Sequence, residues 1–158
     1  MDQRGEQAGE PIDQAGILIR PATRKDRPFI CTLSKEVFSP YGNYEHIIPR
    51  LFMNPDVLTL VSFEKMQPLG FIMLSVLSGE IMAIAVKPRY QSRGIGTALL
   101  NNTESIAKRL GMKKLLLHTA VENEIGGRFF QKASFSVINK EESYYPKGQG
   151  ALVMAKEL

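Results

Sequence analysis

The sequence predicts a mixed α/β fold in which a central sheet carries helices on both faces. The chain has 158 residues, of which 44% are hydrophobic and 23% charged, and this is enough for one domain with a hydrophobic core. Apolar stretches at 57–63, 69–77 and 81–86 are separated by short turns, which is typical of strands joined by hairpins. Farther along, strand and helix patterns alternate, which indicates β–α–β units on the same sheet.

The expected elements have recognisable boundaries. Thr23, with Asp26 three residues later, resembles a capping box and marks the start of a helix. Pro88 ends the strand at 81–86, because proline has no backbone donor for the ladder, and Gly111 marks the end of the next helix. The expected order is strand 17–20, helix 23–37, helix 44–52, strands 57–63, 69–77 and 81–86, helix 97–110, strand 114–121, helix 123–132 and strands 135–138 and 152–155.

The first sixteen residues differ in composition from the rest of the chain. They are polar, and four acidic residues against Arg4 give them a net charge of −3. Because the whole chain carries +4, residues 17–158 carry +7. We expect residues 1–16 to form a flexible tail and residues 17–158 to form a single domain, without repeats or linkers.

The cysteine content and the hydrophobic runs indicate the cellular compartment in which we expect the protein. Cys31 is the only cysteine, which excludes an internal disulfide framework and suits a reducing compartment, so we interpret it as a packing residue. No apolar run reaches the ~18 residues of a membrane span. The start of the sequence lacks the apolar core of a signal peptide. We therefore expect a cytoplasmic protein that does not bind a membrane.

A glycine-containing loop at 91–96 joins the strand at 81–86 to the following helix. Gly94 and Gly96 would let the backbone approach an anion, and the dipole of the helix favours negative charge at this end. A dinucleotide fingerprint is excluded, because it needs a third glycine where Leu99 stands. A nucleoside-triphosphate loop is excluded as well, because it needs Gly-Lys-Ser/Thr and Gly96 is followed by Thr97.

The basic residues near this loop indicate the kind of anion. Lys87, Arg89 and Arg93 lie close together in sequence, whereas no recognisable nucleic-acid-binding module is present. We therefore expect a small polyanion rather than a nucleic acid as the partner.

This strand, loop and helix resemble the GNAT superfamily of acetyl-CoA-dependent N-acetyltransferases. The resemblance rests on Ile84-Ala85-Val86-Lys87-Pro88 and on Gln91-Ser92-Arg93-Gly94-Ile95-Gly96-Thr97-Ala98-Leu99-Leu100. It implies a mixed, mainly antiparallel sheet of about six or seven strands over residues 17–158. It implies acetyl-CoA as co-substrate, no metal, a pantetheine contact at Ile84, Ala85 and Val86, and a pyrophosphate cradle made by Gln91, Ser92, Arg93, Gly94, Ile95, Gly96 and Thr97.

A second segment supports the same resemblance and also departs from it. Asn123 stands where the family has an asparagine that caps a helix and meets the cofactor. Phe130 stands where the family often has a tyrosine that protonates the leaving thiolate, and a phenyl ring cannot do this. We expect Phe130 to keep the cofactor contact without the acid function. Ser134 stands where glycine is usual.

Two residues are candidate bases for removing the proton of an acceptor amine. Glu80 lies at the start of the cofactor strand, where histone-type members of the family have a glutamate base. His118 lies five residues before Asn123, where some protein N-terminal acetyltransferases have a histidine or glutamate base. Histidine titrates near neutrality, so we favour His118 as the base for an α-amine, with Glu80 holding a water or the ammonium. Solvent or Tyr144 would protonate the thiolate.

The acceptor is less clear from the sequence. The resemblance implies an acceptor groove between the segment with Tyr41 and Tyr44 and the segment with Tyr144 and Tyr145. The pair Tyr144-Tyr145 and the last eight residues resemble ribosomal-protein-type N-terminal acetyltransferases, which favours a protein α-amine. The alternatives are a small-molecule amine such as a polyamine, amino acid or drug, and a non-catalytic acetyl-CoA-binding regulator. We expect a monomer or a homodimer.

Overall fold

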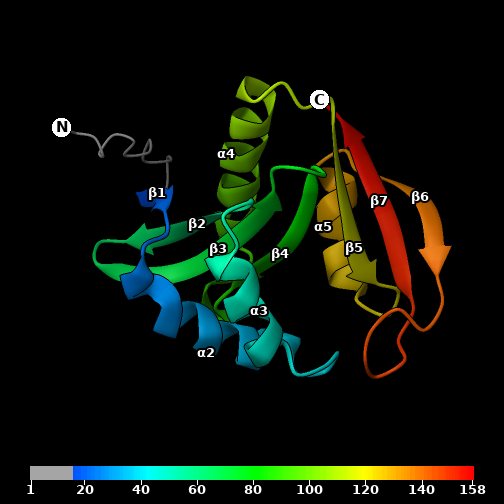
Figure 1. Cartoon of the computed structure of the whole chain (residues 1–158), viewed down its shortest axis with the longest axis horizontal. Coiled ribbons are helices and arrows are strands. Elements are labelled where there is room, and N and C mark those ends of the chain that lie inside the picture. Colours follow the sequence, from blue (N-terminus) through cyan, green and yellow to red (C-terminus); the bar gives the residue numbers. More distant parts are fainter. Residues whose placement is uncertain (1–15) are drawn as a thin grey trace.

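The computed structural model describes residues 16–158, so the tail expected at 1–16 lies outside the described residues apart from Gly16. One seven-stranded sheet runs through the molecule in the order β1-β2-β3-β4-β5-β7-β6 (Figure 1). The elements are β1 (Ile17–Pro21), η1 (Arg24–Asp26), α2 (Arg27–Phe38), α3 (Tyr44–Met53), β2 (Val57–Glu64), β3 (Gln67–Ser75), β4 (Glu80–Val86), η2 (Pro88–Tyr90), α4 (Ile95–Arg109), β5 (Lys114–Ala120), α5 (Glu124–Lys132), β6 (Ser136–Glu141) and β7 (Ala151–Glu157).

The strand pairing confirms the mixed, mainly antiparallel sheet. β1 to β4 are joined by antiparallel pairing, and β5, β7 and β6 form a second antiparallel group. Between the two groups, β4 and β5 pair in parallel, which needs a crossover connection, and α4 lies in this connection. The order also places β7 between β5 and β6, so β6 forms an edge of the sheet.

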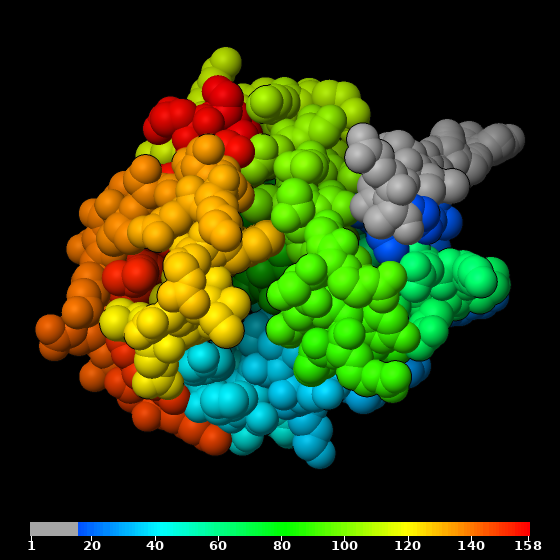
Figure 2. Space-filling model, turned by 180° about the vertical axis from the view of Figure 1, so that it is seen from behind, coloured from blue at the N-terminus to red at the C-terminus, as the bar shows by residue number. Residues whose placement is uncertain are grey.

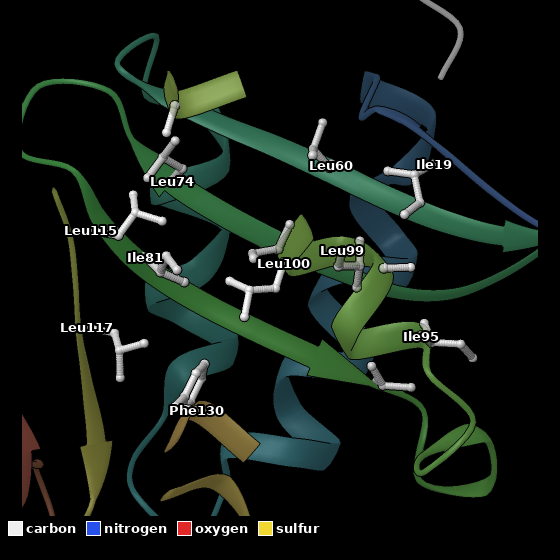
Figure 3. Close-up of a cluster of buried hydrophobic side chains, with 14 of the residues drawn as sticks. Ile19, Leu60, Leu74, Ile81, Ile95, Leu99, Leu100, Leu115, Leu117 and Phe130 are labelled. Carbon is white, nitrogen blue, oxygen red and sulfur yellow. The ribbon is translucent and has the colours of Figure 1, made fainter. Parts of the chain in front are cut away.

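Helices cover both faces of the sheet, as the sequence predicts. On one face, α4 and α5 enclose a core in which Leu99 and Phe130 meet sheet residues such as Leu60, Ile81 and Leu117 (Figure 3). On the other face, α2 and α3 pack on alternate residues of β2, β3 and β4. The two cores share the same strands, because successive side chains of a strand point to opposite faces.

Several element boundaries differ from those expected. β3 begins at Gln67, before Pro68, because Pro68 lies opposite Phe63 at a register shift where a missing ladder donor is tolerated. α4 begins at Ile95 rather than at residue 97, because Gly94 takes a left-handed conformation and serves as its N-cap. β6 and β7 are longer than expected, since their pairing extends to Glu141 and Ala151.

Local sequence signals explain two helix ends. Thr23 and Asp26 form the expected capping box, which encloses η1 and leads into α2. At the end of α5, Ser134 has a φ of +76°, and the Phe135 N–H donates to the Phe130 carbonyl at 3.0 Å. This is a Schellman motif, which explains why a glycine is usual at the position of Ser134.

Candidate active site

The central feature of the site is the separation of β4 from β5. Within the described residues, the ladder between these strands joins only Glu80 with Leu116 and Ile81 with Leu117. At Met82 the pairing of β4 with β3 shifts register, since Met73 lies opposite Ala83 and Leu74 opposite Ile81. A β-bulge increases the local twist and turns a strand away from its neighbour. The edge of β4 after the bulge, which includes Ile84, Ala85 and Val86, is therefore free of β5.

The glycine loop follows directly from this free edge. The side-chain amide of Gln91 donates to the Val86 carbonyl at 3.0 Å and holds the start of the loop against β4. Ser92 and Gly94 both have left-handed backbone conformations, with φ of +65° and +86°. No side chain caps α4, so the first N–H groups of this 15-residue helix, from Ile95 to Thr97, are directed out of its N-terminus. The sequence expectation of an anion-binding helix start is consistent with this geometry.

A hollow lies between α4 and α5 beside this helix start, and Figure 2 shows it between the lime-green and yellow segments. The cavity has a volume of about 310 Å³. Thr97 and Asn101 line it from α4, and Lys132 lines it from α5. Lys156 also lines it, and its ammonium is paired with both carboxylate oxygens of Glu104 at 2.9 Å. Within the described residues no hydrogen bond or ion pair involves the Lys132 ammonium, so this lysine of the cavity is available to an anion.

Two predicted cofactor residues have other contacts in the structure. The Arg93 guanidinium lies 3.2 Å from a carboxylate oxygen of Glu64 and 5.3 Å from the centre of the Tyr90 ring. A Cβ on Gly96 would lie 3.3 Å from the Phe129 ring, so the backbone at Gly96 packs closely against α5. A role of Arg93 toward the cofactor therefore competes with its ion pair to Glu64.

Asn123 and Phe130 hold α5 at the other side of the opening. The Asn123 side chain accepts a hydrogen bond from the Gly126 N–H at 3.0 Å, so it caps α5 as expected. Phe130 is only 6% exposed and packs edge to face against Phe129 and Phe135. The phenyl ring thus serves the core, and its contact with a cofactor stays a prediction.

The structure brings the three predicted catalytic residues together. His118 Nδ1 lies 3.1 Å from Glu80 Oε2, across the short β4–β5 ladder. The Tyr144 ring is stacked on the His118 ring with centroids 4.3 Å apart and planes 6° apart. A fourth residue, Glu141, lies with Oε1 at 3.6 Å from His118 Nε2. His118 is partly buried, with 20% of its side chain exposed.

The predicted acceptor residues form a cluster above this centre. The ring centroid of Tyr145 lies 5.2 Å from that of Tyr41 and 5.0 Å from that of Tyr144. Tyr44 lies close enough to raise the pKa of Tyr144 and of Tyr145. Burial raises the pKa of Tyr144, and Glu80, Tyr44 and Glu141 raise it further. Burial also raises the pKa of Tyr145, with smaller contributions from the neighbouring tyrosines. These hydroxyl groups therefore stay protonated at neutral pH, as an acid or a hydrogen-bond donor requires.

Comparison with known proteins decides the family. The model of the acetyltransferase (GNAT) family matches residues 23–135. The chain belongs to this family. It is therefore an acetyl-CoA-dependent N-acetyltransferase, as the sequence motifs imply.

Three similar proteins illustrate the range of the GNAT family. N-alpha-acetyltransferase 30 of Schizosaccharomyces pombe is 25% identical over 145 residues, which cover 85% of this chain and 94% of that protein. Spermidine N(1)-acetyltransferase of Thermoplasma acidophilum is 32% identical over 98 residues, which cover 61% of each. The structure of the ribosomal-protein-S18-alanine N-acetyltransferase from Escherichia coli has a TM-score of 0.79 at 21% identity, with coverage of 89% of this chain and 93% of that chain. At that identity the structural likeness supports the fold alone.

The features of this GNAT site fit an acyl-CoA co-substrate. The free edge of β4 leads through the glycine loop to the uncapped start of α4, and Thr97 of this helix start also lines the cavity between α4 and α5. Among residues 16–158, no group of three or more His, Cys, Asp or Glu side chains is placed to hold a metal. In the same described part, no helix has the length and apolar character of a membrane span.

Sequence reasoning missed two acidic residues of this site. Glu141 lies 23 residues after His118 and reaches it across β7, so no short motif links the two. Glu122 lies near Tyr41, where its charge helps to raise the pKa of the tyrosine after the larger effect of burial. The two predicted bases, in contrast, follow from their positions in a family motif.

Proposed function

We propose that this N-acetyltransferase acetylates the α-amino group of a protein N-terminus, with His118 as general base. The observation that supports this most directly is the Glu80–His118 pair at 3.1 Å beneath the tyrosine cluster. Glu80 orients the imidazole and stabilises its protonated form, in the way that the aspartate of a Ser-His-Asp triad does. Glu80 thus has an orienting function in this proposal rather than that of a second base.

The residues of the chain would supply each requirement of the reaction. Bound acetyl-CoA provides an acetyl thioester, which the acceptor amine attacks directly. The free edge of β4 supplies backbone N–H groups that can stabilise negative charge on the carbonyl oxygen. His118 Nε2 accepts the proton of the acceptor, and an α-amine, with a pKa of about 8, loses its proton more readily than a lysine side chain. Tyr144 or solvent protonates the thiolate, because Phe130 has no proton to give.

The cofactor would be held by residues on both sides of the opening. Ile84, Ala85 and Val86 would bind the pantetheine arm through the β4 backbone, and Asn123 borders the opening from α5. The loop at 91–96 and the start of α4 would bind the pyrophosphate. The cavity beside Lys132 offers a positive charge for the nucleotide part of the molecule.

A small amine remains the second candidate, and a specific observation favours it. A spermidine N(1)-acetyltransferase is among the similar proteins, and three carboxylates, Glu80, Glu122 and Glu141, lie at the acceptor side. Carboxylates are suited to an acceptor with more than one ammonium group.

Product analysis distinguishes these candidates. The enzyme and acetyl-CoA would be incubated with a library of peptides with free N-termini, the same peptides with formylated N-termini, and a panel of polyamines, amino acids and amine drugs. We expect mass spectrometry to show acetylation of free N-termini and none on the formylated controls, even where these contain lysine. Preferred acetylation of a polyamine would replace the peptide proposal with the second candidate. Acetyl-CoA binding without any product in the library would reject both acceptor candidates.

A further inference from the structure

The second ring nitrogen of His118 faces a carboxylate that the reaction described above does not use. His118 Nδ1 is 3.1 Å from Glu80, within hydrogen-bond distance, whereas Nε2 is 3.6 Å from Glu141 Oε1, beyond it. Glu141 is the last residue of β6, and 44% of its side chain is exposed. Glu141 therefore lies on the solvent-exposed side of the Glu80–His118 pair.

The hydrogen-bonding capacity of these groups shows what is missing between them. A carboxylate can only accept hydrogen bonds, so the Glu80 contact assigns the proton of a neutral His118 to Nδ1. The lone pair of Nε2 then faces a second acceptor, Glu141. Two acceptors at this distance need a donor, which is either a proton on Nε2 itself or, while Nε2 is unprotonated, a donor from the acceptor molecule. An ammonium group has three N–H donors and a positive charge, so it satisfies both acceptors at once.

The sheet geometry allows Glu141 to reach this position. Glu141 pairs with Ala151 of β7, and Ala151 pairs with Ala120 of β5, so two alanines occupy the row beside His118. The small side chain of Ala151 leaves room for the Glu141 carboxylate to extend over β7 toward β5. Lys140 pairs with Leu152 and therefore points to the opposite face, where it does not neutralise Glu141.

We propose that Glu141 binds the protonated amino group of the acceptor and places it against His118 Nε2. This inference rests on the proposed function, in which His118 is the base. One N–H bond of the ammonium breaks, its proton moves to Nε2, and the nitrogen keeps the electron pair with which it attacks the thioester. Glu141 stays ionised throughout, and Glu80 balances the positive charge that the imidazole gains. Glu141 is thus a binding residue for the acceptor cation, and it does not accept the transferred proton.

The test compares Glu141→Gln with Glu142→Gln. Both variants remove one negative charge, but Glu142 is exposed and lies outside β6, and among the described residues the ion-pair partners of His118 are Glu80 and Glu141. Initial rates would be measured for wild type and both variants with two probes, a peptide with a free N-terminus from the library above and spermidine. We expect Glu141→Gln to raise the acceptor KM about ten-fold, with a smaller effect on kcat and none on the acetyl-CoA KM. The ten-fold value is at the low end for a charged hydrogen bond because Glu141 is partly exposed.

Binding gives a second readout that does not depend on turnover. Calorimetry with the CoA-saturated enzyme should show weaker binding of the probe amine to Glu141→Gln and unchanged binding of its N-acetylated product, which has no charge. An unchanged acceptor KM, or a rise equal to that in Glu142→Gln, would overturn the assignment. If the enzyme acetylates only spermidine, the peptide proposal is rejected, and the KM for spermidine in Glu141→Gln then tests the role of Glu141. If the enzyme acetylates neither probe, both the peptide proposal and the assignment of Glu141 are rejected.

Discussion

His118 is the residue for which the contacts make the strongest case for a direct chemical role. It is held by Glu80, stacked on Tyr144 and partly buried at the end of the β4–β5 ladder. We expect His118→Ala to lower kcat by about 10²–10⁴-fold, the range for loss of a general base. Steady-state rates under saturating acetyl-CoA and acceptor would measure this.

Two further variants show whether the loss in His118→Ala is specific. One removes Glu80, the partner of the proposed base, and the other removes a histidine outside the site. Glu80→Ala should cost less than His118→Ala, because it removes the orienting carboxylate, leaves the imidazole and adds no amide N–H that could hold the wrong tautomer. His46→Ala is the control, since the His46 side chain on α3 is 76% exposed and has no contact with the site. A larger loss in Glu80→Ala than in His118→Ala would make Glu80 the base and favour a histone-type or small-amine acceptor.

Single residues were predictable from the sequence where a family motif marks them. The predicted residues Glu80, His118 and Tyr144 belong to three separate segments, and the structure brings them together. Glu141 was not predictable, because its role depends on the register of β6 on β7 and on the small side chain of Ala151. Register and side-chain volume across an edge strand leave no short-range signal in the sequence.

At the level of elements, we expect the start of α4 to contribute to coenzyme A binding. Gly94 and Gly111 flank this helix with nearly the same backbone conformation, at φ of +86° and +84°, and an added Cβ would meet no atom within 4 Å at either. An alanine at either position therefore strains the backbone by a similar ~1–2 kcal/mol. We expect only Gly94→Ala to weaken coenzyme A binding, by about ten-fold, because only its Cβ lies at the anion-binding end of the helix.

Calorimetry with coenzyme A measures this difference, and thermal unfolding without ligand checks that both variants lose similar stability. Equal affinity of coenzyme A for the two variants would argue against a pyrophosphate at this helix start. Gly96→Val would be a less selective test, because its side chain would also push on Phe129.

Element order was largely predictable, whereas element ends were not. The strand and helix patterns of residues 57–132 are local, so periodicity and punctuation by glycine and proline locate them. The ends of β6 and β7 depend on pairing between distant residues, such as Glu141 with Ala151. The separation of β4 from β5 depends on a bulge at Met82, and no single residue in the sequence predicts this bulge.

At the level of the whole molecule, the two halves of the sheet are linked at both ends of the opening. At one end, β4 and β5 share two residue pairs. At the other end, the segment between β6 and β7 contacts the segment after α2, more than one hundred residues earlier. The Lys147 ammonium donates to the Ser39 carbonyl at 3.0 Å, and the Gln149 amide donates to the Pro40 carbonyl at 2.8 Å. This second link also fixes the tyrosine cluster, because Tyr41 and Tyr145 lie on its two segments.

Loss of this link should therefore affect the acceptor more than the cofactor. Each hydrogen bond contributes about 0.5–1.5 kcal/mol, so Lys147→Ala with Gln149→Ala should raise the acceptor KM by about five- to ten-fold. The acetyl-CoA KM should change by less than about two-fold, because the glycine loop and α4 lie outside the link. Lys140→Ala is the control, as an exposed lysine of β6 with no contact to the α2–α3 segment. Initial rates with each substrate varied in turn measure both constants. A parallel rise in the two would mean that the link holds the sheet halves together for both substrates, and that the tyrosine cluster has no separate role in acceptor binding.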